Sequence, residues 1–111
     1  MRVIGRDELK AKLDRRDPFR LIMTLGEAAY ESKHIPGSTY VSDPRETEPV
    51  FEDLPPDSEI VVYCSNASCV ASIAAYRRLE ARGFTNVRRF PGGLQEWEAA
   101  GYPLERGRVS R

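Results

Sequence analysis

The chain of 111 residues is 41% hydrophobic, and its 17 basic and 17 acidic side chains give a formal net charge of zero. This length and composition fit one compact domain over residues 1–111 that can bury a core without extra cross-links. A balanced charge produces no overall field that would attract nucleic acid or an anionic membrane, so we expect neither as a partner.

The start of the chain carries Arg2 and Arg6, which interrupt any apolar run of signal-peptide length. No later stretch is apolar enough to span a membrane, so we expect a cytoplasmic protein. Cys64 and Cys69 are too few for the disulfide framework of a small secreted protein. Zinc usually takes four ligands, and only His34 could join the cysteines, so we expect no metal or other cofactor. This leaves redox or nucleophilic sulfur chemistry as the role expected of the two cysteines.

Strand-like and helix-like segments alternate along the chain. In order, we expect a strand at 2–4, a helix at 7–13, a strand at 19–24, a helix at 27–32, strands at 39–41 and 59–64, a helix at 69–82, a strand at 86–90 and a helix at 94–100. Segment 59–64 is rich in β-branched residues, which is typical of a strand buried on both faces of a parallel sheet. The alternation predicts a three-layer α/β/α domain with a central, mostly parallel sheet of about five strands.

Three polar segments are interpreted as surface. Residues 42–58 are rich in Pro, Asp and Glu, with Phe51 and Leu54 as the few apolar anchors, and form a long surface connection. The tail 106–111 is expected to fray. A basic cluster is interpreted as a solvated face, and it comprises Arg77, Arg78, Arg82, Arg88 and Arg89.

Cys64 ends the buried strand and begins a loop of small residues that leads into the long helix. Backbone N–H groups of such a loop can point inward, and the helix start adds a partial positive charge. A thiol has a reference pKa of about 8.5 and falls well below it at helix N-termini, so Cys64 is a candidate thiolate at the mouth of the loop. A buried strand-end cysteine without chemistry fits these residues equally well.

Several motifs together resemble the signatures of the rhodanese family. They are His34-Ile35-Pro36-Gly37-Ser38, Ile60-Val61-Val62-Tyr63-Cys64, Gly83-Phe84-Thr85-Asn86-Val87, Pro91-Gly92-Gly93-Leu94-Gln95-Glu96-Trp97 and Ala100-Gly101-Tyr102-Pro103. Their order and spacing also match, and the similarity extends over residues 3–104. The resemblance implies a rhodanese-like fold and sulfurtransferase activity.

By this resemblance, Cys64 is the nucleophile that accepts sulfur as a persulfide. The backbone amides that hold the persulfide then belong to Ser65, Asn66, Ala67, Ser68 and Cys69. The implied partners are a small sulfur donor, such as thiosulfate, polysulfide or a persulfide, a cyanide or thiol acceptor, and a protein donor or acceptor. The alternative is a non-enzymatic sulfur-relay or protein-binding module.

The chain departs from the family pattern in two places. Met23-Thr24-Leu25 stands where many members carry an Asp-x-Arg pair, and the Cys64 loop lacks the Lys or Arg typical of members efficient with thiosulfate. We therefore expect thiosulfate to be a weak donor. Cys69 is either a small residue at the helix start, which we favour, or a resolving thiol.

Other residues invite functional and structural interpretations. A phosphatase of the cell-cycle type needs Cys-x5-Arg to bind phosphate, and the sequence has Val70 at the arginine position.

We expect His34 to hold its turn rather than act in catalysis, and Trp97 and Phe90 to pack in the core. Gly92 and Gly93 would permit close backbone approach to the loop, although the requirements of a turn alone would also explain them. Ser68 or Ser72 is expected to cap the helix, and Asn66 to settle a turn.

Overall fold

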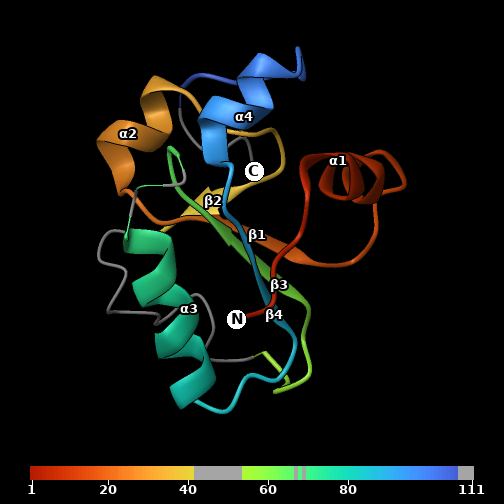
Figure 1. Ribbon diagram of the computed structural model, residues 1–111, viewed down its shortest axis with the longest axis vertical. Helices are drawn as coiled ribbons and strands as arrows, with labels where there is room; N and C mark the ends of the chain where they lie inside the picture. Colours follow the sequence, from red (N-terminus) through yellow and green to blue (C-terminus); the bar gives the residue numbers. More distant parts are fainter. Residues whose placement is uncertain (42–53, 67, 69, 108–111) are drawn as a thin grey trace.

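The computed structural model describes residues 1–41, 54–66, 68 and 70–107. In this part of the chain, four parallel strands form one sheet in the order β2-β1-β3-β4 (Figure 1). The strands are β1 (Arg20–Met23), β2 (Thr39–Tyr40), β3 (Ile60–Tyr63) and β4 (Val87–Phe90). The helices are α1 (Arg6–Asp14), α2 (Glu27–Ser32), α3 (Ala71–Ala81) and α4 (Gly93–Ala99).

Within the described residues, the sheet has one strand fewer than the sequence predicts. The segment 2–4 contributes a single parallel bridge between Val3 and Arg89, with hydrogen bonds from Ile4 N to Arg89 O and from Arg89 N to Arg2 O. Gly5 and the start of α1 at Arg6 follow immediately, so this segment is too short to extend the ladder.

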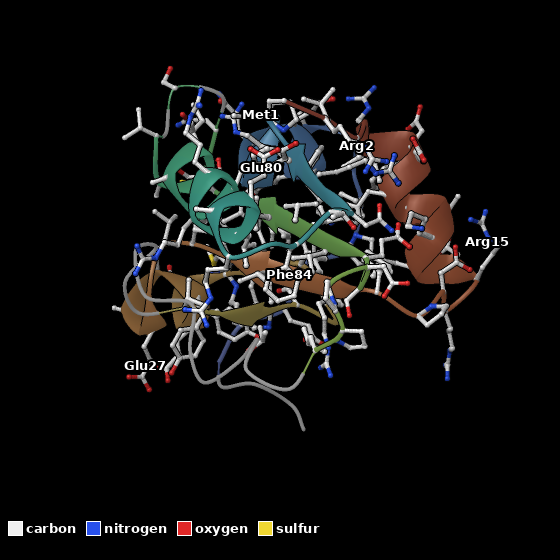
Figure 2. All side chains as sticks on the ribbon, turned by 90° about the horizontal axis from the view of Figure 1, so that it is seen from below. Met1, Arg2, Arg15, Glu27, Glu80 and Phe84 are labelled. Atoms are coloured by element: carbon white, nitrogen blue, oxygen red, sulfur yellow. The ribbon has the colours of Figure 1, made fainter. Side chains whose placement is uncertain are left out.

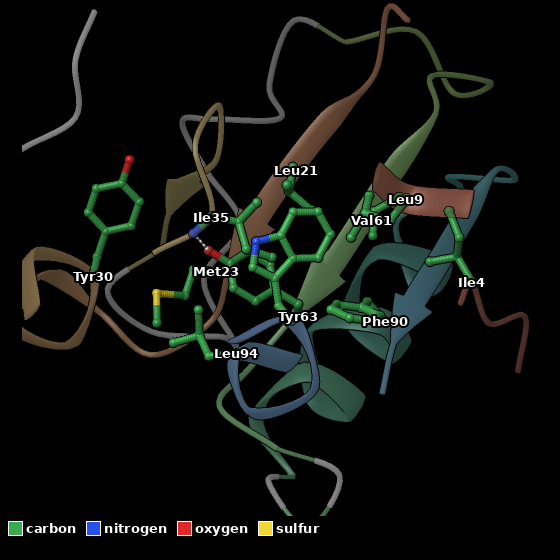
Figure 3. Close-up of a cluster of buried hydrophobic side chains, with 11 residues drawn as sticks. Ile4, Leu9, Leu21, Met23, Tyr30, Ile35, Val61, Tyr63, Phe90 and Leu94 are labelled. Atoms are coloured by element: carbon green, nitrogen blue, oxygen red, sulfur yellow. Dashed lines mark hydrogen bonds between the residues drawn. The ribbon is translucent and has the colours of Figure 1, made fainter. Parts of the chain in front are cut away.

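Helices cover both faces of the sheet, which confirms the three-layer architecture. One face packs against α1, α2 and α4 through a cluster that includes Leu21, Met23, Val61, Tyr63 and Trp97 (Figure 3). The other face packs against α3, and its cluster includes Ile22, Ile60, Val62, Tyr76 and Leu79. Side chains alternate between the two faces of a sheet along each strand. Strands β1 and β3 lie inside the sheet and, apart from exposed Arg20 at the start of β1, they are buried on both faces.

Charged side chains extend from the outside of the helical layers, as Arg15 and Glu27 show in Figure 2. Phe84, only 8% exposed, instead points into the α3 side of the core. Among the described residues, no helix is long and apolar enough to cross a membrane.

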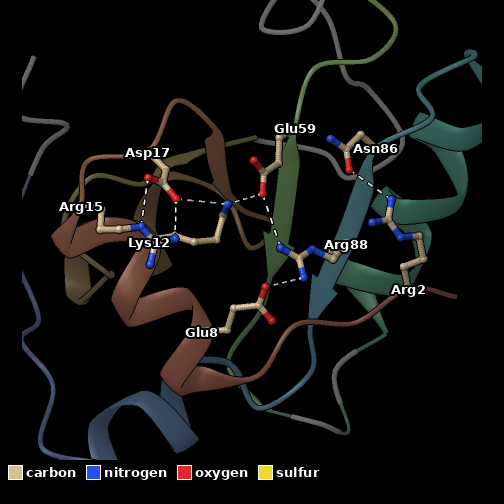
Figure 4. Close-up of polar contacts among 8 residues, drawn as sticks. All are labelled: Arg2, Glu8, Lys12, Arg15, Asp17, Glu59, Asn86 and Arg88. Carbon is tan, nitrogen blue, oxygen red and sulfur yellow. Dashed lines mark hydrogen bonds and ion pairs between the residues drawn. The ribbon is translucent and has the colours of Figure 1, made fainter.

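Two surface expectations are wrong in part. Arg88 and Arg89 are neighbours in β4 and therefore point to opposite sheet faces. Arg88 pairs with Glu8 at 2.9 Å and Glu59 at 3.4 Å (Figure 4), whereas Arg89 is buried against α3. The start of the tail is also held, because Gly107 N donates to Glu31 O at 2.8 Å. Arg106 donates to Ser32 O at 3.2 Å, and residues 108–111 lie outside the described part of the chain.

The connection predicted at 42–58 is described only from Leu54 onward, so Phe51 lies outside the described residues. Leu54 is partly buried and packs against the α3-side core, as expected of an anchor.

Candidate active site

The candidate site lies where β3 ends. Tyr63 is the last residue of β3, and its carbonyl oxygen accepts two hydrogen bonds from Thr24, from the backbone N at 3.0 Å and from Oγ1 at 3.1 Å. Thr24 is 1% exposed and stands in the segment that departs from the family's Asp-x-Arg pattern. Its contacts fix the peptide that leads from the strand into Cys64, and no pattern in the sequence indicates this role.

Cys64 is 1% exposed and forms a disulfide. This differs from the expected free thiol at the mouth of the loop, because the sulfur is both oxidised and covered. Cys69, the other cysteine in the sequence, and Ala67 lie outside the described residues, so their predicted places in the loop are not tested.

The first turn of α4 holds the beginning of the Cys64 loop. Leu94 N donates to Cys64 O at 3.0 Å, and Gln95 N donates to Ser65 O at 2.8 Å. These donors are among the N–H groups that a helix leaves unpaired at its start, so the loop carbonyls satisfy them.

Gly93 makes this close approach possible. A Cβ at Gly93 would collide with Cys64 O, and it would lie 2.9 Å from the Ser65 carbonyl carbon and 3.0 Å from Asn66 N. Gly93 also has a φ of 61°, which favours glycine. The prediction of close backbone approach is confirmed for Gly93. For Gly92 it is wrong, because a Cβ there would meet the Glu96 side chain instead.

The carbonyl contacts also orient the loop amides. In a trans peptide the N–H points opposite to the C=O, so the amides of Ser65 and Asn66 point away from α4. Neither amide has a hydrogen-bond acceptor within the part of the chain that the structure describes. Both residues are partly exposed. The loop therefore presents two aligned donors, an arrangement that suits an anion.

Asn66 stabilises the rest of the described loop. Its Oδ1 accepts a hydrogen bond from Ser68 N at 2.9 Å, which confirms the predicted turn. The expected serine cap is absent from α3, whose N-cap is Val70, without a side-chain capping bond. Ser72 instead accepts a hydrogen bond from Arg89 Nε at 2.8 Å.

The His34 turn is structural, as predicted. His34 is 1% exposed and stacks on Tyr30 with 3.6 Å between ring centroids. Its Nδ1 lies 2.7 Å from Tyr30 O, and its Nε2 lies 3.2 Å from Glu105 Oε1.

Tyr63 ties this turn to β3. Its hydroxyl accepts from Ile35 N at 3.1 Å and lies 2.9 Å from Ser38 Oγ. Burial raises the pKa of Tyr63 above its ordinary value, more than these hydrogen bonds lower it, so the phenol remains neutral.

The predicted packing of the aromatic residues is confirmed. Phe90 and Trp97 are each 1% exposed and meet edge to face with 6.2 Å between ring centroids. Trp97 Nε1 donates to Pro103 O at 2.7 Å, so its polar atom is also satisfied.

The chain belongs to the rhodanese-like domain family, whose model matches residues 5–100. It resembles the solution structure of the rhodanese-like domain of the Alr3790 protein from Anabaena, with a TM-score of 0.80 and 24% identity, covering 100% of this chain and 83% of that one. The thiosulfate sulfurtransferase of Pseudomonas aeruginosa superposes with a TM-score of 0.84 at 24% identity, covering 96% of this chain and 20% of that one. These likenesses show the fold.

The chain also resembles part of a curated transcriptional regulator. The HTH-type transcriptional regulator Rv0324 of Mycobacterium tuberculosis is 35% identical over 78 residues, which cover 70% of this chain. The match spans about a third (34%) of the regulator's length.

Proposed function

We propose that this protein is a sulfurtransferase that carries sulfane sulfur on Cys64 as a persulfide. The observation that carries the proposal is the loop at the end of β3. Contacts from Leu94 and Gln95 hold its carbonyls against α4 and leave the Ser65 and Asn66 amides pointing the other way. Aligned amides favour a thiolate, and afterwards the outer anionic sulfur of a persulfide.

The reaction has two half-steps. The Cys64 thiolate attacks the sulfane sulfur of a donor, a new S–S bond to Cys64 forms, and the donor's S–S bond breaks. The electron pair of that bond leaves with the rest of the donor, as a thiolate from a persulfide, a shorter sulfur anion from polysulfide, or sulfite from thiosulfate. An acceptor then attacks the outer sulfur, which releases Cys64 as thiolate. With cyanide the product is thiocyanate. This is covalent catalysis with ping-pong kinetics.

The donor class follows from charge. Ser65, Asn66 and Ser68 offer amides and neutral side chains, and the loop sequence contains no Lys or Arg. A thiosulfate dianion would gain no loop cation, whereas polysulfide or a low-molecular-weight persulfide needs less compensation. We therefore propose polysulfide or a persulfide as the better donor.

The test is the mass of the reduced protein after incubation with polysulfide and, separately, with thiosulfate. We expect one added sulfur on the peptide containing Cys64 and its loss on addition of cyanide. Cys64→Ser should take up no sulfur and should lose sulfur transfer to cyanide. Wild-type transfer rates in Cys64→Ser would disprove the proposal. Faster loading from thiosulfate than from polysulfide would overturn the donor class.

A non-enzymatic sulfur-relay or protein-binding module is the second candidate function. The match to a transcriptional regulator supports it, because the same persulfide could act as a signal or be passed to a protein partner. Turnover number separates the two functions. An enzyme forms many thiocyanate molecules per chain, whereas a relay module loads once and turns over slowly with small acceptors.

A further inference from the structure

Arg89 is a buried cation at the carboxyl end of β4. It is 8% exposed, and its Nε donates to Ser72 Oγ at 2.8 Å. Ser72 is 1% exposed and is the second residue of α3, the helix that follows the Cys64 loop. The hydrogen bond therefore joins the first turn of α3, directly after the loop, to the sheet.

The register places Arg89 beside the strand that carries Cys64. Val62 of β3 pairs with Arg89, and both lie on the α3 side of the sheet. Cys64 directly follows Tyr63, the last residue of β3, and therefore lies at the carboxyl end of the strand that pairs with β4. Strands β3 and β4 lie side by side and α3 covers their common face (Figure 1). Arg89, Ser72 and Cys64 thus gather around the carboxyl ends of two neighbouring strands.

The Arg89 guanidinium keeps its charge, because an arginine side chain does not lose its proton in proteins. At this place it adds a permanent positive charge to the partial positive charge of the α3 N-terminus. The positive potential of both features favours the anionic form of a titratable group close by. The Cys64 thiolate and the Cys64 persulfide are such groups.

We propose that Arg89 is a positioning residue for the Cys64 site. Through Ser72 it fixes the first turn of α3 against β4, and its charge favours the anionic forms of the Cys64 sulfur. This inference depends on the proposed function for its biological meaning. It also replaces the interpretation of Arg89 as part of a solvated face.

The test measures the alkylation of Cys64 by iodoacetamide against pH, in the full chain reduced with a dithiol and analysed by peptide mass. We expect Arg89→Met to raise the pKa of the Cys64 thiol by about one, which lowers the alkylation rate below that pKa about tenfold. Arg89→Lys keeps the charge and should stay close to wild type. Ser72→Ala should raise the pKa by a smaller amount.

Arg88→Met is the matched control, because it removes the neighbouring charge on the opposite sheet face. A pKa shift in Arg88→Met equal to that in Arg89→Met would overturn the proposal, as would wild-type behaviour of Arg89→Met. If circular dichroism shows that Arg89→Met does not fold, Ser72→Ala provides the test. An unchanged pKa of the Cys64 thiol in Ser72→Ala then overturns the proposal. Alkylation needs no sulfur transfer. A wild-type chain that never gains sulfur would therefore refute the proposed function separately.

Discussion

The sulfur of Cys64 is covered and forms a disulfide, so it can attack a donor only after two-electron reduction. We expect protein prepared without reductant to take up no sulfur from polysulfide. Reduction with a dithiol, followed by its removal, should restore one added sulfur per chain. The measurement is intact mass before and after each step.

Cys69→Ser is the informative variant for this prediction, because Cys69 is the only other cysteine in the sequence. It should load sulfur without prior reduction, and mild peroxide should over-oxidise its Cys64 more readily. Full loading of unreduced wild-type protein would contradict the prediction. A requirement for reduction that persists in Cys69→Ser would point to an intermolecular disulfide instead.

Gly93 is the residue whose side chain the loop cannot accept. Gly93→Ala would place a Cβ against Cys64 O and would strain a backbone with a φ of 61°. We expect the free energy of unfolding to fall by about 1–3 kcal/mol and sulfur loading to fall with it. Urea unfolding and the loading assay measure the two effects. Gly5→Ala is the control, since a Cβ at Gly5 meets nothing within 4 Å and φ there is −86°. Equal losses in both variants would contradict the prediction.

Sequence reasoning found the residues that belong to motifs and missed those that act through the fold. Cys64 and Gly93 lie in recognisable patterns. Thr24 and Arg89 do not, because their importance comes from strand register, which brings Thr24 to the end of β3 and Arg89 to α3. The sequence alone does not show which face of the sheet each arginine of a run points to, because this depends on the strand that carries the run.

At the scale of elements, α1 ends in a Schellman motif with an unusual residue. Arg16 N donates to Leu13 O at 3.1 Å, and Asp17 N donates to Lys12 O at 3.0 Å. Arg16 has a φ of 58°, the only positive φ among the described non-glycine residues. We expect Arg16→Gly to raise the free energy of unfolding by about 0.5–1 kcal/mol, because glycine adopts this conformation without the steric cost.

Arg15→Gly provides the comparison for Arg16→Gly in the same urea titration. Arg15 has an ordinary helical φ of −78°, and its guanidinium contacts Asp17 at 2.7 Å. Glycine at position 15 should lower stability, because it adds chain entropy and removes that contact. Stabilisation by both substitutions, or by neither, would contradict the account of Arg16.

Periodicity predicts the kinds and order of the helices and strands. It predicts the residues at which they begin and end less accurately. The range of α2 was predicted correctly as 27–32, whereas α3 begins at Ala71 instead of 69. Strand ends depend on the neighbour that supplies the ladder, as the single bridge at Val3 shows. The hydrogen bonds of Arg106 and Gly107 to α2 also depend on tertiary contacts that no local pattern reveals.

At the scale of the whole molecule, ion pairs link α1 to the sheet and to the segment before β1 (Figure 4). The hydrogen bond from Arg15 lowers the pKa of Asp17, and Lys12 at 3.6 Å adds to this effect. The unfolded chain therefore takes up a proton at Asp17 before the folded chain does. The stabilisation is present above about pH 4 and is lost as the pH falls through the lower folded pKa.

We expect Asp17→Asn to reduce the stability at neutral pH and to flatten part of its decline in acid. Thermal unfolding from pH 7 to pH 3 measures this. Asp57→Asn changes an exposed carboxylate without an ion pair among the described residues, and it should leave the pH dependence unchanged. Parallel acid profiles for wild type and Asp17→Asn would contradict the assignment.

The two hydrogen bonds from α4 to the Cys64 loop couple segments that are distant in sequence. Coupling of this kind is reciprocal in free energy. A sulfur species that stabilises the closed loop must stabilise the first turn of α4 by the same amount, and a change that loosens α4 must weaken the hold on that species. The amide hydrogens of Leu94 and Gln95 can exchange with solvent only when these bonds open. The exchange rates of these two amide hydrogens therefore depend on the state of the sulfur at Cys64.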